Sequence, residues 1–122
     1  MEVSSFEKLA VWKRGGRQAL AIYSALKDTK DFGLKNQMER ASVSVPSNIA
    51  EGAERKSTQE FIRFLNISLG SNAELRTQIY LAKELGIIND AQPLIKEAKE
   101  ISACSKVLSA LSKRNCKLFT AH

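Results

Sequence analysis

Apolar residues recur every three or four positions in four long segments of the chain, and short polar connections separate these segments. This period is typical of an α-helix that turns one face to a core. It predicts four helices at about residues 5–27, 34–55, 58–85 and 90–115. Because short connections join antiparallel neighbours, we expect one all-α domain over residues 1–122, an antiparallel up-down-up-down four-helix bundle.

The same spacing predicts which residues face the core. Two adjacent glycines, Gly15 and Gly16, lie inside the first segment, where each is less stable than alanine by about 1 kcal/mol, so we expect a close helix contact there. The expected core positions are Leu9, Trp12, Gly16, Ala19, Tyr23 and Leu26; Met38, Ala41, Val45, Ile49 and Ala53; Phe61, Phe64, Leu65, Leu75, Ile79 and Ala82; and Leu94, Ala98, Ile101, Ser105, Leu108 and Leu111.

Signals for helix ends agree with this division. A serine followed three residues later by a glutamate, the capping-box spacing, occurs at Ser4 and again at Ser57. Gly86 is placed to end the third helix in the left-handed conformation. Asn89 and Asp90 then offer N-caps for the fourth helix.

The second segment contains an unusual stretch, RASVSVPSNIAEG at residues 40–52. Pro46 lacks a backbone N–H and crowds the carbonyl four residues earlier, which costs about 3 kcal/mol in an ordinary helix interior. We predict a proline-kinked helix, and a turn between two short elements is the alternative. Four short side chains could bond the freed backbone groups: Ser42, Ser44, Ser47 and Asn48.

This stretch also carries a resemblance. With its flanking residues it resembles the four-helix-bundle family named for proteins encoded in 23S rRNA intervening sequences, over roughly residues 6–88. Related in shape are accessory proteins of diversity-generating retroelements, which are basic five-membered rings that bind a reverse transcriptase and nucleic acid. The resemblance therefore implies a homo-oligomer, a homopentamer, with RNA, DNA or a protein as partner. The flanking residues that carry it are Phe6, Leu9, Val11, Trp12, Phe32, Gly33, Leu34, Gln37, Arg55, Glu60, Phe61, Phe64, Leu65, Gly70, Ser71, Glu74 and Leu75.

Polar residues share one face of the second helix and interrupt the apolar pattern of the third. If these faces meet, Arg40 or Arg63 could pair with Glu51 or Glu74 and lock the bundle or an oligomer interface. Arg40→Ala is then expected to melt or dissociate the protein. We call this set the polar seam; it consists of Arg40, Ser44, Pro46, Asn48, Glu51, Arg63, Asn72 and Glu74.

The net charge of +6 is concentrated at the two ends of the chain: residues 1–30 carry +3 and residues 91–122 carry +4. A basic surface of this kind favours phosphate backbones without base readout, and a merely solvated face is the alternative. Five such chains in a ring would carry +30. The aromatic residues Phe6, Trp12, Phe61 and Phe64 are assigned to the core. The candidate nucleic-acid-binding residues, expected to merge into one patch, are Lys8, Lys13, Arg14, Arg17, Lys106, Lys113, Arg114 and Lys117.

Other functional classes lack the residues they need. The single histidine is His122, the two cysteines are Cys104 and Cys116, and no nucleophile–base pair, metal-ligand spacing or phosphate-binding glycine loop is recognisable. We therefore expect no enzyme, no cofactor and no metal. The absence of a long apolar run or a signal-peptide pattern leads us to expect a cytoplasmic protein without a membrane partner.

Overall fold

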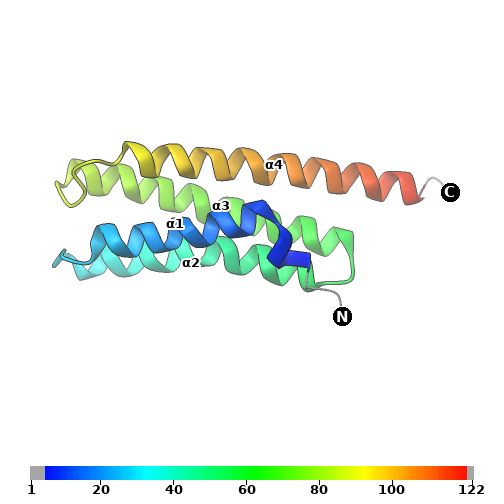
Figure 1. The fold of residues 1–122 in the computed structure, drawn as a ribbon, viewed down its shortest axis with the longest axis horizontal. Helices are drawn as coiled ribbons and strands as arrows, with labels where there is room; N and C mark the ends of the chain where they lie inside the picture. The colour runs from blue at the N-terminus through cyan, green and yellow to red at the C-terminus, as the bar shows by residue number, and fades with distance from the viewer. Residues whose placement is uncertain (1–4, 121–122) are drawn as a thin grey trace.

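The computed structural model describes the backbone of residues 5–120 and the side chains of residues 6–114. A short 3-10 helix, η1 (Ser5–Lys8), precedes four long helices, and Figure 1 shows that the chain direction reverses from each helix to the next. The C-terminal part of α4 projects beyond the ends of its neighbours (Figure 1). The expected all-α four-helix fold is confirmed, with α1 (Ala10–Leu26), α2 (Phe32–Glu54), α3 (Thr58–Glu84) and α4 (Gln92–Thr120).

Two of the predicted helix ends are confirmed. The Ser57 hydroxyl accepts a hydrogen bond from the Glu60 amide at 3.2 Å, which caps α3. At the other end of α3, Gly86 has φ of +75°. The amides of Gly86 and Ile87 donate to the carbonyls of Lys83 and Ala82, which is the Schellman arrangement of a glycine C-cap.

Two other predicted starts are wrong. The capping-box position Ser4 lies outside the described residues, and α1 begins only at Ala10, because η1 intervenes. Helix α4 begins at Gln92 rather than directly after Asn89 or Asp90. Its first backbone hydrogen bond runs from the Ile95 amide to the Ala91 carbonyl, at 3.0 Å. Ala91 is buried, so packing of the connection sets this start instead of a polar cap.

Helix α2 continues through Pro46, as predicted in preference to a turn. Nearby side chains bond backbone carbonyls around the proline: Asn48 Nδ2 donates to the Ser44 carbonyl at 2.8 Å, and Ser68 Oγ of α3 donates to the Val45 carbonyl at 2.8 Å. These bonds compensate part of the disturbance that a proline introduces. The kink itself stays a prediction.

The core consists of two apolar clusters along the bundle, and most predicted core positions belong to them. The assignment for α1 is partly wrong, because Tyr23 is 45% exposed and Trp12 and Gly16 are only half-buried. The buried face of α1 instead includes a polar residue, Gln18. Because Gln18 interrupts the apolar period, the spacing of apolar residues does not indicate which face of α1 is buried. Other α1 residues on that face are Val11, Gly15, Ala19, Ile22 and Leu26.

Two glycines mark close contacts between helices. A Cβ atom on Gly15 would lie 3.3 Å from Val45 Cγ1 and 3.4 Å from Pro46, so the expected contact exists at Gly15. Nothing lies within 4 Å of the corresponding position on Gly16, so the contact predicted there is absent. At Gly52, a Cβ atom would lie 2.6 Å from Phe64 Cβ, which only a hydrogen can accommodate without movement of α3.

Gly52→Ala is therefore expected to lower the free energy of unfolding by about 1–3 kcal/mol through overpacking, although alanine is the better helix former. Gly70→Ala is the matched control, because nothing lies within 4 Å of its Cβ position on α3. The free energy of unfolding of this control is expected to rise by up to about 1 kcal/mol, because alanine is the better helix former. Urea denaturation of both variants measures the contrast, and equal stabilities would contradict the packing assigned to Gly52.

Candidate nucleic-acid interface

Arg14 is neutralised by two carboxylates of α4 and is not a free cation. Its Nε and Nη2 donate to the two carboxylate oxygens of Glu97 at 2.9 and 2.8 Å, and Nη2 also bonds Glu100. Its Nη1 lies 3.7 Å from Cys104 Sγ. A bidentate arginine–carboxylate pair fixes geometry as well as charge. Its assignment to the nucleic-acid-binding set is therefore wrong, and Arg14 instead joins α1 to α4.

This cluster shifts the pKa values of Arg14 and Glu97. The hydrogen bonds from Arg14 hold the pKa of Glu97 below its ordinary value, and the charge of Arg17 adds to this effect, while partial burial opposes it. The same bonds, to Glu97 and then Glu100, raise the pKa of Arg14. The Arg14–Glu97 pair is therefore charged at neutral pH.

We expect the contribution of Glu97 to stability to be pH-dependent in one direction. Because its folded pKa is depressed, the contribution is complete above the ordinary glutamate value of 4.5 and is lost as the pH falls through the folded pKa. The midpoint temperature of Glu97→Gln should lie below that of the parent at neutral pH, and the difference should shrink in acid. A difference that is independent of pH would contradict this role.

Lys13 and Arg17, by contrast, are exposed and form no ion pair within the described side chains. They lie one turn apart on α1, at a spacing where side chains are neighbours. Both line an open groove of about 580 Å³ between α1 and α2. We call this the α1–α2 groove; its lining residues are Phe6, Trp12, Lys13, Gly16, Arg17, Pro46, Ser47 and Ala50.

Four aromatic residues were assigned to the core, and for three of them the assignment is only half right. Phe6 and Trp12 are half-buried, with their rings 5.1 Å apart in an edge-to-face arrangement. Phe61 is also half-buried, whereas Phe64 is buried. Phe6 and Trp12 therefore present aromatic surface beside Lys13 and Arg17. The spacing of apolar residues did not predict this exposure.

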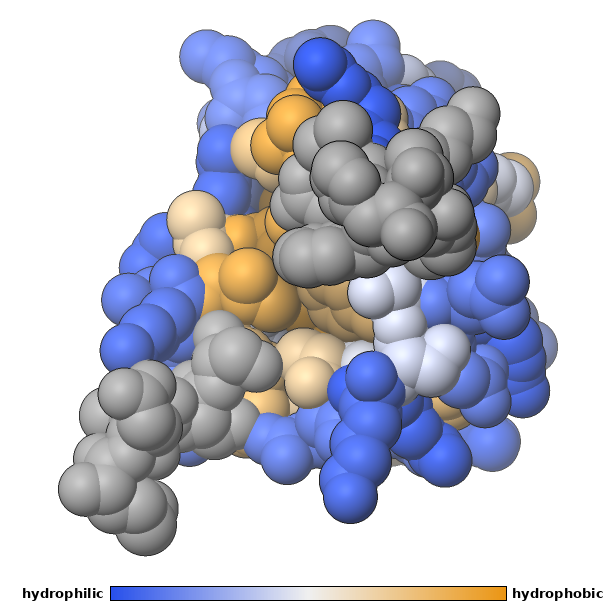
Figure 2. Space-filling view, turned by 90° about the vertical axis from the view of Figure 1, so that its right-hand side faces the viewer, coloured by the Kyte–Doolittle hydropathy of each residue, from blue (hydrophilic) through white to orange (hydrophobic). Residues whose placement is uncertain are grey.

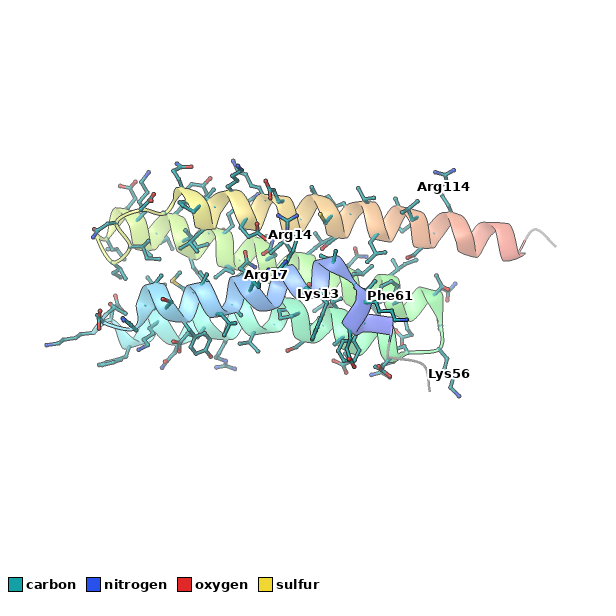
Figure 3. The ribbon with its side chains drawn as sticks, in the orientation of Figure 1. Lys13, Arg14, Arg17, Lys56, Phe61 and Arg114 are labelled. Atoms are coloured by element: carbon teal, nitrogen blue, oxygen red, sulfur yellow. The ribbon has the colours of Figure 1, made fainter. Side chains whose placement is uncertain are left out.

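Of the remaining predicted cations, Arg114 does not join this group. Lys8, Lys106, Lys113 and Arg114 are exposed, and the Lys117 side chain lies outside the described residues. In Figure 3 Arg114 lies on the projecting end of α4, well separated from Lys13 and Arg17. The predicted merging of the two basic clusters is thus wrong for Arg114, because α4 extends past the start of α1 instead of ending beside it.

Two small residues of the polar seam, Ser44 and Asn48, bond each other, and Ser44 also bonds Ser71 of α3, but the charges of the seam do not meet. Ser44 Oγ and Ser71 Oγ lie 2.8 Å apart between α2 and α3, and Asn48 Nδ2 donates to Ser44 Oγ at 2.8 Å. The predicted long-range ion pairs are absent from the described residues, since the local pairs Arg55–Glu51 at 3.2 Å and Arg63–Glu60 at 3.5 Å form instead. Local pairs on one helix form more readily because their partners are already held close together.

Arg40 and Glu74 are both exposed and line an open groove of about 810 Å³ between α2 and α3. Neither has an ion-pair partner among the described side chains. Arg40 is therefore not a buried lock, and the structure of the single chain gives no reason for Arg40→Ala to melt it.

Asn72 is the seam residue that is fully buried, and it connects three helices. Its Oδ1 accepts a hydrogen bond from Gln18 Nε2 at 3.0 Å, and its Nδ2 donates to the Ala98 carbonyl at 2.7 Å and to Ser102 Oγ at 2.8 Å. The residue thus links α3 to α1 and α4 in the interior. These bonds between specific polar atoms fix the register of the three helices, and Gln18 Oε1 is the one atom of the network without a partner in the described residues.

Within the described residues there is no group of three or more histidine, cysteine or acidic side chains placed to hold a metal ion. Cys104 is a free, half-buried thiol, while the side chains of Cys116 and His122 lie outside the described residues. No helix in the described part of the chain has the length and apolarity to cross a membrane.

A family model described as 23S rRNA-intervening sequence protein matches residues 7–107. The match covers all of α1, α2 and α3 and the first half of α4. No curated protein matches the chain.

Proposed function

The chain belongs to the 23S rRNA-intervening sequence protein family, and we propose that it binds RNA or DNA without sequence specificity through the exposed cations of α1. The observation that carries this proposal is the contrast along α1. Arg14 is paired with two carboxylates, while Lys13 and Arg17 have no such partner among the described side chains. Cations without an ion-pair partner remain available for phosphate groups.

The expected binding is electrostatic. Each lysine or arginine that contacts a phosphate displaces condensed counterions from the nucleic acid, so affinity falls steeply as salt increases. Lys8 lies before α1, and Lys106, Lys113 and Arg114 lie on α4, so a strand that leaves the α1 site can meet further positive charge. Contacts to the backbone position the protein but do not read the base sequence.

We also propose that the functional form is a homo-oligomer, a five-membered ring according to the family resemblance. Several large hydrophobic side chains remain exposed on the described surface, and contiguous exposed apolar surface is typical of interaction sites. They include Leu20, Tyr23, Phe32, Val43, Ile67, Tyr80, Leu81 and Leu85. In this proposal the protein is a non-enzymatic, cytoplasmic component without a cofactor.

Fluorescence anisotropy of a labelled oligonucleotide, titrated with the protein at two salt concentrations, tests the proposed function. We expect micromolar or tighter binding at low salt and a steep negative slope of the logarithm of affinity against the logarithm of salt concentration. Sequence changes in the oligonucleotide should have little effect. Absence of binding at low salt would end the proposal.

A specific observation favours a second candidate, an accessory subunit or scaffold that binds a protein and makes no direct contact with nucleic acid. Figure 2 views the end of the bundle from which α4 projects and shows hydrophobic surface between hydrophilic flanks. The start of α1 and the later part of α4 enclose an open apolar groove of about 390 Å³, lined by Leu9, Ala10, Val11, Ala103, Cys104, Val107, Leu108 and Leu111.

Because Lys106 and Arg114 lie near this apolar groove in the sequence of α4, an acidic segment with an apolar face is the partner that fits it. Val107 is 59% exposed, so Val107→Glu should abolish binding of such a partner without unfolding the protein. If the Val107→Glu variant still associates with an acidic protein after nuclease treatment, this groove is not the binding site for that partner.

A further inference from the structure

The α1–α2 groove combines an apolar floor with two cations, and one of its residues has no packing role. Gly16 lies inside α1, where glycine is less stable than other residues. Gly15 next to it is explained by its close approach to Val45 and Pro46, but a Cβ atom on Gly16 would meet nothing within 4 Å. The missing side chain therefore leaves the groove open and contributes nothing to helix packing.

The chemistry around this opening is specific. Phe6 and Trp12 supply aromatic surface, and Pro46 and Ala50 of α2 extend the apolar lining on the other side. Lys13 and Arg17 are exposed beside it and carry no ion-pair partner among the described side chains. The volume of about 580 Å³ lies within the range of small-ligand sites.

We propose that the α1–α2 groove receives an unpaired base of a single-stranded nucleic acid, while Lys13 and Arg17 hold the adjoining phosphates. An aromatic or apolar surface beside a cationic rim is the combination by which proteins hold single strands, because every base has a flat face that can stack. A double helix keeps its bases stacked internally and cannot offer one to the groove. The inference rests on the proposed function and goes beyond it by predicting a preference for single strands.

Trp12 is the single tryptophan of the chain, so its fluorescence reports on this groove directly. We expect a single-stranded oligoadenylate to quench Trp12 emission along the same curve that anisotropy gives for binding. RNA and DNA versions of the strand are compared, and quenching by either supports the groove. A duplex of the same sequence is expected to bind by anisotropy at low salt and to leave Trp12 emission unchanged.

Gly16→Leu fills the groove and should weaken binding of the single strand about tenfold or more, while duplex affinity changes by less than about twofold. Gly70→Leu is the matched control, because Gly70 also has nothing within 4 Å of its Cβ position and lies on α3. It should bind both ligands like the parent. Circular dichroism establishes whether both variants are folded. The quenching of Trp12 in the parent protein tests the groove even if a variant fails to fold.

The outcomes separate the two proposals. If single and double strands bind alike, Trp12 emission does not respond and Gly16→Leu binds as the parent does, the groove inference is overturned while the proposed function stands. If anisotropy detects neither ligand at low salt, both are overturned. If the single strand quenches Trp12 emission and Gly16→Leu weakens single-strand binding alone, both the proposed function and the groove inference are supported.

Discussion

Asn72→Ala is expected to lower the free energy of unfolding by about 3 kcal/mol or more, because the substitution removes two buried hydrogen bonds and one partly buried bond at once. Gln18 Nε2 and Ser102 Oγ would each lose their partner. The loss falls on Gln18 especially, since its Oε1 already has no hydrogen-bond partner within the described residues. A buried amide without partners costs more than the net value of the bonds it made.

Urea denaturation of the parent and the variant measures this effect. Asn66→Ala is the matched control, because Asn66 is an exposed asparagine on the same helix, α3. The control should change the free energy of unfolding by no more than about 0.5 kcal/mol. If Asn72→Ala is as mild as Asn66→Ala, the interior network does not hold the three helices together.

The double variant Lys13→Glu with Arg17→Glu is expected to weaken nucleic-acid binding about 100-fold at low salt, because two phosphate contacts are replaced by repulsion. The slope of the logarithm of affinity against the logarithm of salt concentration should become shallower by about 2. Both side chains are exposed and make no ion pair among the described residues, so the fold should be unaffected.

A variant with the same change in net charge separates local contacts from the general field. Lys27→Glu with Lys30→Glu serves this purpose, since both lysines are exposed and follow the C-terminal end of α1. We expect this control to weaken binding only modestly. Equal losses in the two double variants would show that net charge alone, and not the exposed cations of α1, determines affinity.

Periodicity was sufficient to predict the four helices, because each presents an apolar face over many turns. It placed the start of α1 wrongly, since a short 3-10 helix precedes it. It also misjudged the buried face of α1, where Gln18 takes a core position that its polarity disguises. Its partner Asn72 is 54 residues away, and no local pattern in one sequence encodes such a pairing.

The candidate interface was predictable only in part for the same reason. The sequence does not distinguish Arg14 from Lys13 and Arg17, because all three are basic residues of one helix. The carboxylates that neutralise Arg14 are 83 and 86 positions away in the sequence. Ser44 of the polar seam bonds Ser71 of α3, so α2 and α3 do meet at this residue. Two charged residues of the seam, Glu51 and Arg63, form short-range pairs along their own helices, which periodicity does not distinguish from pairs between helices.

The central claim is that nucleic acid binds at the exposed cations of α1 beside the α1–α2 groove. Titration of the isotope-labelled protein with a single-stranded oligonucleotide, followed by amide chemical-shift mapping, tests it most directly. The largest shifts should fall on residues 12–17 of α1 and 46–50 of α2 and disappear on addition of salt. Shifts confined to the apolar groove between the start of α1 and α4, or no shifts at low salt, would contradict the claim.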